Sequence, residues 1–144
     1  HGVSVEEMPE TELVCVLPKA HSLTKKSEIN VTDLAEEPLL LISENSLMRK
    51  RLLQTFKQAG ITPNVILDST YTGPICSLVG QGMGISILDA LTAEAYATHD
   101  ITILPFLPSV PCGLKLVLPA NQTLSKPAQA FVDIARSVLP SVVS

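Results

Sequence analysis

The segment from Leu78 to Leu88 constrains the fold most strongly, because an apolar helix end passes through spaced glycines directly into an apolar strand. The apolar positions before Gly82 recur at intervals of three and four residues, which predicts a helix that buries one face. Gly82 and Gly84 lack a Cβ, so they are predicted to form a left-handed helix stop and a tight turn. The run from Ile85 to Leu88 then predicts a buried strand. A helix that feeds a strand in this way indicates an α/β protein.

Strands and helices are predicted to alternate along the rest of the chain. The strands are expected at Val3–Met8, Glu12–Leu17, Leu39–Ile42, Val65–Leu67, Ile85–Leu88, Ile101–Phe106 and Leu114–Leu118. Helices are expected from Ser46 to Ala59, from a cap at Thr72 or Gly73, from a cap at Asp89 to Ala97, and from Pro127, with a single turn capped by Thr32. This spacing favours right-handed βαβ crossovers. The predicted fold is therefore a Rossmann-like, mostly parallel sheet with flanking helices.

Composition limits the function classes that remain open. The 144 residues contain 46% hydrophobic and 17% charged residues, so one well-packed domain is expected rather than disorder. The net charge of −4 leaves no basic face of the kind that phosphate backbones require. An uncharged apolar run long enough for a membrane span is absent from the sequence, and so is a signal-peptide pattern. We therefore expect a soluble, cytoplasmic protein that does not itself bind DNA.

The cysteines and histidines give no sign of a metal or redox centre. The sequence contains an odd number of cysteines, namely Cys15, Cys76 and Cys112, which lack C-x-x-C spacing and lie in apolar contexts. Buried free thiols are therefore expected, and a redox switch is the alternative. The histidines lie singly and without metal-ligand spacing, and are expected to be exposed to solvent: His1, His21 and His99.

Several motifs in order resemble the effector-binding domain of LysR-type bacterial transcription regulators. The segment Pro18–Leu23 is similar to the family's P-x-x-H-P-L, although Ser22 replaces a proline, and residues 78–88 fit an L-V-x-x-G-x-G-I-x-x-L block. Further segments that match the family's motifs in the same order are Val31–Leu34, Pro38–Ile42, Phe56, Gly60–Pro63 and the region from Leu114 to Val138. Each motif alone is degenerate, but their order covers nearly the whole chain.

The resemblance implies a lobe of the type 2 periplasmic-binding-protein-like fold. Residues 18–106 would form the second regulatory subdomain, and residues 1–17 and 107–144 would supply crossover strands and a C-terminal helix that returns toward the first subdomain. The N-terminal winged helix-turn-helix and most of the first subdomain would lie outside this chain, so DNA would be contacted only through a domain absent from it. A small effector would bind in a cleft between the subdomains and alter the oligomer. The apolar stripe Phe131, Ile134 and Val138 would then lack its usual cover, so we expect a homo-oligomer, specifically a dimer.

Two polar corners follow predicted parallel strands, where ligands collect in open α/β sheets. The candidate effector-binding residues are Ser43, Glu44, Asn45 and Ser46 at the first corner, Thr70, Tyr71 and Thr72 at the second, and Gly84 and Ile85 as a cleft floor implied by the resemblance. Ser46 and Thr72 are equally explained as helix N-caps. Hydroxyl and amide groups suit a small carboxylate, whereas Glu44 either pairs with an amino group of the effector or lies in solvent. A carboxylate or amino-acid effector is therefore expected.

Two other classes of protein were weighed against a regulator. A lobe of a periplasmic solute-binding protein shares the architecture, but the free cysteines and the Pro18–Leu23 motif argue against it. An enzyme lacks support because Gly82-Met83-Gly84 has no nucleophile between its glycines, and no Ser/His/Asp set is evident. The glycine-rich run follows a helix and precedes a strand, the reverse of a dinucleotide site. We therefore predict no catalytic residues, no cofactor and no metal.

Overall fold

The structure, a computed structural model, describes residues 2–43 and 47–143. The chain forms two compact units, which are described separately. The terminal unit comprises residues 1–11 and 111–144, and the central unit comprises residues 12–110. In the described part of the chain, no helix combines the length and apolarity needed to cross a lipid bilayer.

Helices and strands alternate through the central unit, as the sequence predicts. Its elements are β2 (Thr11–Pro18), η1 (Ser22–Lys25), β3 (Ile29–Asn30), η2 (Val31–Leu34), β4 (Pro38–Ile42), α1 (Leu47–Gln58), β5 (Asn64–Ser69), α2 (Thr72–Gly80), β6 (Ser86–Asp89), α3 (Ala90–Ala95) and β7 (Ile101–Leu107). The expected strands and helices of this region are present, with ends that differ by a few residues.

The sheet of the central unit is mixed rather than mostly parallel. Its strands pair in the order β3-β7-β2-β6, with β3 parallel to β7 but β2 antiparallel to both β6 and β7. β4 pairs in parallel with β5 and also bonds to the chain just before β6, where the Leu40 N–H donates to the Ile85 carbonyl at 2.9 Å. β2 leads the chain into the unit and β7 leads it out beside β2, so these neighbours run in opposite directions. The predicted α/β class is confirmed.

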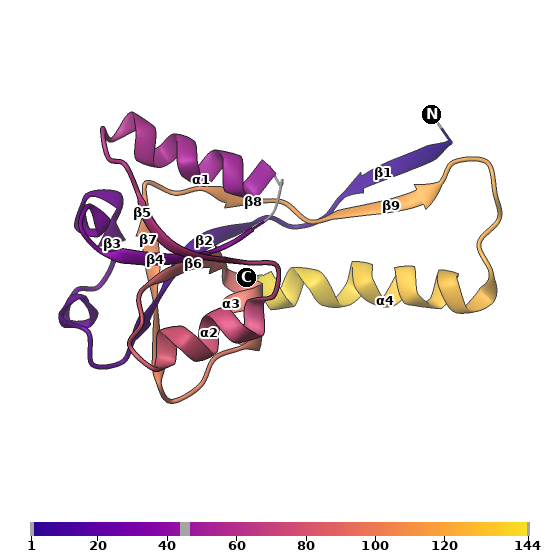
Figure 1. Cartoon of the computed structure of the whole chain (residues 1–144). Coiled ribbons are helices and arrows are strands. Elements are labelled where there is room, and N and C mark those ends of the chain that lie inside the picture. Colours follow the sequence, from indigo (N-terminus) through magenta and orange to yellow (C-terminus); the bar gives the residue numbers. More distant parts are fainter. Residues whose placement is uncertain (1, 44–46, 144) are drawn as a thin grey trace. The chain divides into compact units, whose positions relative to one another are not determined.

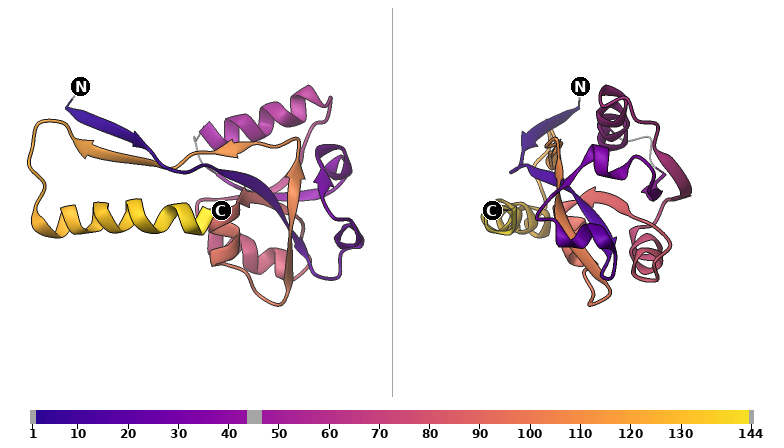
Figure 2. Two further views of the ribbon diagram at one scale, coloured as in Figure 1. Left: turned by 180° about the vertical axis from the view of Figure 1, so that it is seen from behind. Right: turned by 90° about the vertical axis from the view of Figure 1, so that its left-hand side faces the viewer.

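Helices cover both faces of this sheet, with α1 on one side and α2 and α3 on the other (Figures 1 and 2). Leu40 and Ile42 of β4 belong to a buried cluster with Ile75 and Val79 of α2. Successive side chains of a strand point to opposite faces, so the buried Leu39 and Leu41 point toward the α1 side. This double cover explains why β4 reads in the sequence as a continuous apolar run.

The two glycines before β6 have different roles. Gly82 has a φ of +87°, which confirms the predicted left-handed helix stop. Gly84 has no positive φ; instead, a Cβ placed on it would lie 2.5 Å from both Leu40 Cδ1 and the Pro38 carbonyl oxygen. Gly84 is therefore required by the close approach of the chain to β4, not by a special backbone conformation.

The helix caps agree only in part with the sequence analysis. Asp89 caps α3 as predicted, since its carboxylate accepts a hydrogen bond from the Thr92 N–H at 2.9 Å. Thr32 does not cap the turn that follows β3. Asn30 does so, accepting from the Thr32 N–H at 3.1 Å while Asp33 accepts from the Asn30 N–H at 2.9 Å. The reciprocal pair is a capping box, which satisfies two otherwise unpaired donors.

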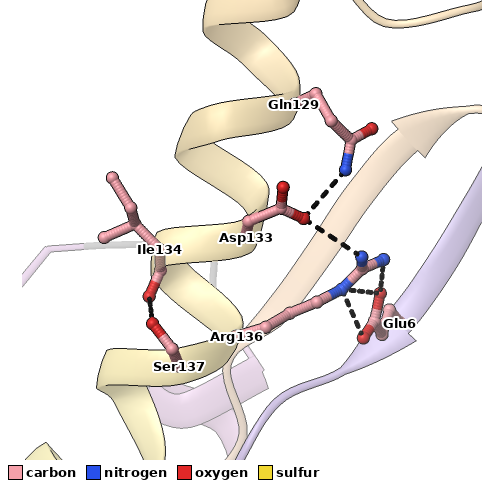
Figure 3. Close-up of polar contacts among 6 residues, drawn as sticks. All are labelled: Glu6, Gln129, Asp133, Ile134, Arg136 and Ser137. Atoms are coloured by element: carbon pink, nitrogen blue, oxygen red, sulfur yellow. Dashed lines mark hydrogen bonds and ion pairs between the residues drawn. The ribbon is translucent and has the colours of Figure 1, made fainter.

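The terminal unit contains β1 (Val3–Glu7), β8 (Pro111–Cys112), β9 (Lys115–Pro119) and α4 (Lys126–Val143), and β1 pairs with β9 in an antiparallel ribbon. An ion pair joins α4 to this ribbon (Figure 3). Arg136 donates from Nε to both Glu6 oxygens at 3.1 Å and from Nη2 to Oε2 at 2.7 Å. These hydrogen bonds lower the pKa of the Glu6 carboxyl and raise that of the Arg136 guanidinium.

Helix α4 presents an exposed apolar stripe, as the sequence predicts. The exposed fractions are 67% for Phe131, 60% for Ile134 and 46% for Val138. Large apolar side chains that recur along one helix face are more often found covered by a partner than exposed to water.

Candidate functional site

The two predicted polar corners meet at the carboxyl ends of β4 and β5. The Ser43 N–H donates a hydrogen bond to the Ser69 carbonyl at 2.7 Å, directly after Ile42 pairs with Ser69 in the ladder. The loops that follow the two strands therefore start side by side. The ends of adjacent parallel strands are the usual place for a ligand in an open α/β sheet.

A hydrogen-bonded turn shapes the second corner. The Ser69 hydroxyl accepts from the Tyr71 N–H at 3.1 Å and donates to the Tyr71 carbonyl at 3.2 Å. Thr70 lies at the tip of this turn and is exposed, and Tyr71 is 72% exposed. Within residues 2–43 and 47–143, nothing hydrogen-bonds the Thr70 hydroxyl. Thr70 thus presents an exposed hydroxyl at the second corner.

The start of α2 adds backbone donors to the same corner. The helix begins at Thr72, so Thr72 is not the cap; Tyr71 occupies the cap position and makes no side-chain capping bond. The first N–H groups of a helix lack intrahelical partners and carry partial positive charge. An uncapped start of this kind favours a negatively charged ligand group.

Arg49 of α1 connects the ends of β4 and β5 and was not among the candidate residues identified from the sequence. Its Nη1 donates to the Ile42 carbonyl at 2.6 Å and pairs with the Asp68 carboxylate at 2.5 Å. The Arg49 side chain is only 19% exposed, whereas that of Asp68 is 50% exposed. The guanidinium thus joins the end of β4 to β5 beneath the corner. Its partners are distant in sequence, so helical periodicity could not find them.

Of the remaining predicted site residues, three lie outside the described residues and two lie at another part of β4. Glu44, Asn45 and Ser46 fall outside the described residues, as does the predicted capping role of Ser46. Gly84 and Ile85 are buried beside Pro38 and Leu39, at the opposite end of β4. A strand rises about 3.3 Å per residue, so the length of β4 separates them from Ser43 by roughly 13 Å. They pack against β4, and their place in the floor of the effector cleft stays a prediction.

The cysteines carry no sign of redox chemistry. All three are free thiols; Cys15 and Cys76 are buried and Cys112 is half-buried. Burial raises the pKa of the Cys15 and Cys76 thiols, which keeps them protonated and unreactive near neutral pH. The prediction of buried thiols is confirmed for these two residues.

The histidines differ from one another. His99 is 87% exposed, as predicted. The prediction is wrong for His21, whose Nδ1 accepts from the Leu23 N–H at 3.0 Å and whose Nε2 lies 3.1 Å from Glu37 Oε2. His21 therefore caps η1 and packs at its start. In the described part of the chain, His, Cys, Asp and Glu do not gather in any group of three or more able to hold a metal ion.

A mixed α/β unit with a polar corner at the ends of two parallel strands is typical of a ligand-binding lobe. The family identity of this lobe is clear, since residues 1–140 match the model of the LysR substrate binding domain. The chain belongs to this family. Its fold accordingly matches LysR effector-binding domains, which have the type 2 periplasmic-binding-protein-like fold.

The relatives are transcription regulators. The chain is 33% identical over 120 residues to the regulatory protein NocR of Agrobacterium tumefaciens (strain T37), covering 83% of this chain and 40% of that protein. It is 29% identical over 143 residues to the transcriptional activator LysR of Escherichia coli (strain K12), and the match covers 99% of this chain and 46% of that protein. The structure of the effector binding domain of QuiR in complex with shikimate superposes with a TM-score of 0.77 at 23% identity. The match covers 97% of this chain and 66% of that chain.

The chain spans less than half the length of these two curated relatives. The relatives favour a regulator over the periplasmic solute-binding protein that the sequence left open.

Proposed function

We propose that this chain senses a small-molecule effector for a bacterial transcription regulator. The observation that carries the proposal is the joined corner, in which the Ser43–Ser69 hydrogen bond brings the loops after β4 and β5 together. Residues 18–106 serve as the second regulatory subdomain. The chain acts in the cytoplasm, catalyses no reaction, and contacts DNA only through a domain outside it.

The effector is a small carboxylate or amino acid. The exposed Thr70 hydroxyl, the Ser43 side chain and the uncapped start of α2 supply donors for a carboxylate. Tyr71 and Thr72 complete the second corner. Glu44, Asn45 and Ser46 extend the first corner in the sequence, and the Glu44 carboxylate suits an effector amino group.

Effector binding acts through a population shift. The ligand favours the state of the oligomer that it binds more tightly, and it can shift the equilibrium only as far as its affinities for the two states differ. Transcription then follows from how that oligomer presents its DNA-binding domains.

A direct test measures thermal unfolding of the chain against a panel of small carboxylates and amino acids, including shikimate and benzoate. A true effector at one hundred times its dissociation constant stabilises the fold by about 2.7 kcal/mol. Thr70→Val is expected to weaken the affinity for that effector about tenfold, because it removes one hydrogen bond to a charged group. The free energy of unfolding without ligand should stay within about 0.5 kcal/mol, because Thr70 is exposed.

Thr62→Val is the matched control, since Thr62 is also an exposed threonine of the central unit but lies before β5, away from the corner. It should bind the same compound like the unmodified chain. Equal affinities for Thr70→Val and the unmodified chain would remove Thr70 from the site. If no compound of the panel stabilises the chain, the proposed effector class is wrong.

We further propose that the chain forms a homodimer through the exposed α4 stripe of Phe131, Ile134 and Val138. Ile134→Glu places a charge in the middle of this stripe and is expected to give a monomer, because a buried unpaired carboxylate costs several kcal/mol. Light scattering after size-exclusion chromatography measures the mass directly. Ser137→Glu, at a polar position of the same helix, should remain dimeric, and a monomeric unmodified chain at high concentration would refute the dimer.

A further inference from the structure

A hollow lies along the side of α2. It has a volume of about 220 Å³ and lies between one face of α2 and the loop that joins α3 to β7. Ser77 and Gln81 line it from the helix, and Tyr96, Thr98 and Asp100 line it from the loop side. Neither the family match nor the predicted effector residues assign it a role.

Glycines in α2 allow the loop to lie this close. A Cβ on Gly73 would lie 3.4 Å from Tyr96 Cε1, and a Cβ on Gly80 would lie 3.1 Å from the Asp100 Cβ. The loop thus touches the helix at two positions seven residues apart and leaves the hollow between them. Larger side chains at these positions would push the loop away.

Hydrogen bonds hold the loop in this shape. The Asp100 carbonyl accepts from the Lys19 N–H at 2.9 Å, which ties the loop to the end of β2. The Asp100 N–H donates to the Thr98 hydroxyl at 3.4 Å, and the Ile101 N–H donates to the Thr98 carbonyl at 3.4 Å. The Asp100 carboxylate is therefore presented from a backbone that is already ordered, which reduces the entropy lost on binding.

The electrostatics of the hollow favour a cation. Its only charged lining group is the Asp100 carboxylate, with neither Lys nor Arg among the lining residues that the structure describes. The Tyr96 ring offers an electron-rich surface to a cation. His99 Nε2 lies 3.0 Å from Asp100 Oδ1, so an exposed imidazole is a competing partner of the carboxylate.

We propose that this hollow binds a small organic ammonium ion. The ammonium donates to the Asp100 carboxylate and to the hydroxyl oxygens of Thr98 and Ser77, and its carbon chain lies along α2 beside the Tyr96 ring. The hollow includes Gly73 near the start of α2, next to the carboxylate-binding corner, but its proposed ligand is a cation and the proposal does not depend on the function proposed for that corner.

Titration of the isotope-labelled chain with ethylammonium, followed by amide chemical shifts, tests this site. Saturable shifts are expected at Ser77, Gly80 and Thr98, and 1-propanol and acetate at the same concentrations should not reproduce them. Asp100→Asn should weaken binding about tenfold, because it replaces a charge-assisted hydrogen bond with a neutral one. Glu94→Gln makes the same change of charge at an exposed carboxylate of α3 outside the hollow, and should bind normally.

Ser77→Leu provides a second variant, which fills the hollow without changing any charge and should abolish the shifts. Ser77 is an exposed helix position, so the fold should tolerate the change. Non-saturable shifts, equal shifts with 1-propanol, or equal weakening by Asp100→Asn and Glu94→Gln would each overturn the proposal. None of these results bears on the carboxylate panel, so failure here is distinguishable from failure of the proposed effector function.

Discussion

Gly84→Ala is expected to destabilise the chain by about 3 kcal/mol or more, a large share of the stability of an ordinary domain. The added Cβ would lie 2.5 Å from Leu40 Cδ1 and from the Pro38 carbonyl oxygen. The leucine methyl could move, but the carbonyl could not move cheaply, because it accepts the Ile85 N–H at 2.9 Å. Relief of the overlap therefore requires separation of β4 from the chain that enters β6. Urea unfolding followed by circular dichroism measures the loss.

Substitutions of two other glycines distinguish the cost of steric overlap from the cost of a left-handed backbone conformation. Gly82→Ala meets no atom within 4 Å but must adopt a φ of +87°, so a cost of about 1–2 kcal/mol is expected. Gly113→Ala has free space and no positive φ, and should change stability by less than about 0.5 kcal/mol. If Gly84→Ala is as stable as Gly113→Ala, the close packing of Gly84 on β4 is wrong.

Phe56→Ala is expected to cost about 3–5 kcal/mol, the usual range for a buried phenylalanine. Phe56 is 0% exposed, and with Leu52 it forms the buried face of α1. Its carbonyl also accepts the Ile61 N–H at 3.0 Å, where the chain turns toward β5, so α1 and the following loop are fixed together. The cavity left by the ring would loosen α1 against the sheet.

Phe131→Ala removes the same side chain from a position that is 67% exposed and is the matched control. Thermal unfolding of dilute protein should shift by several degrees for Phe56→Ala and hardly at all for Phe131→Ala. Equal shifts would mean that α1 contributes no more to the core than the exposed face of α4.

Local features of the fold could be read from the sequence. Helix and strand periodicities, the left-handed stop at Gly82 and the cap at Asp89 depend on a few neighbouring residues, and the structure confirms them. Thr32 and Thr72 were misassigned because several capping residues compete within a few positions. Asn30 is the N-cap of η2. Helix α2 begins at Thr72 itself, one residue earlier than a Thr72 cap requires, so Tyr71 occupies the cap position.

Features that depend on distant partners could not be predicted. The direction of β2, the space beside Gly84 and the bridging role of Arg49 arise only when β4, β5, β6 and β7 are assembled. The same holds for the candidate site. The sequence located both polar corners, but their contact rests on the Ile42–Ser69 register, which no local pattern specifies.

The Arg49 brace has a consequence for how new specificities can arise on this scaffold. Arg49 anchors both strand ends through the Ile42 carbonyl and the Asp68 carboxylate, one residue before Ser43 and Ser69. An arginine stays charged throughout the pH range in which proteins fold, and its planar fork holds two acceptors at once. Residues beyond Ser43 and Ser69 can therefore be exchanged while the sheet below keeps its register. The register of the sheet and the identity of the corner residues are therefore set by different contacts.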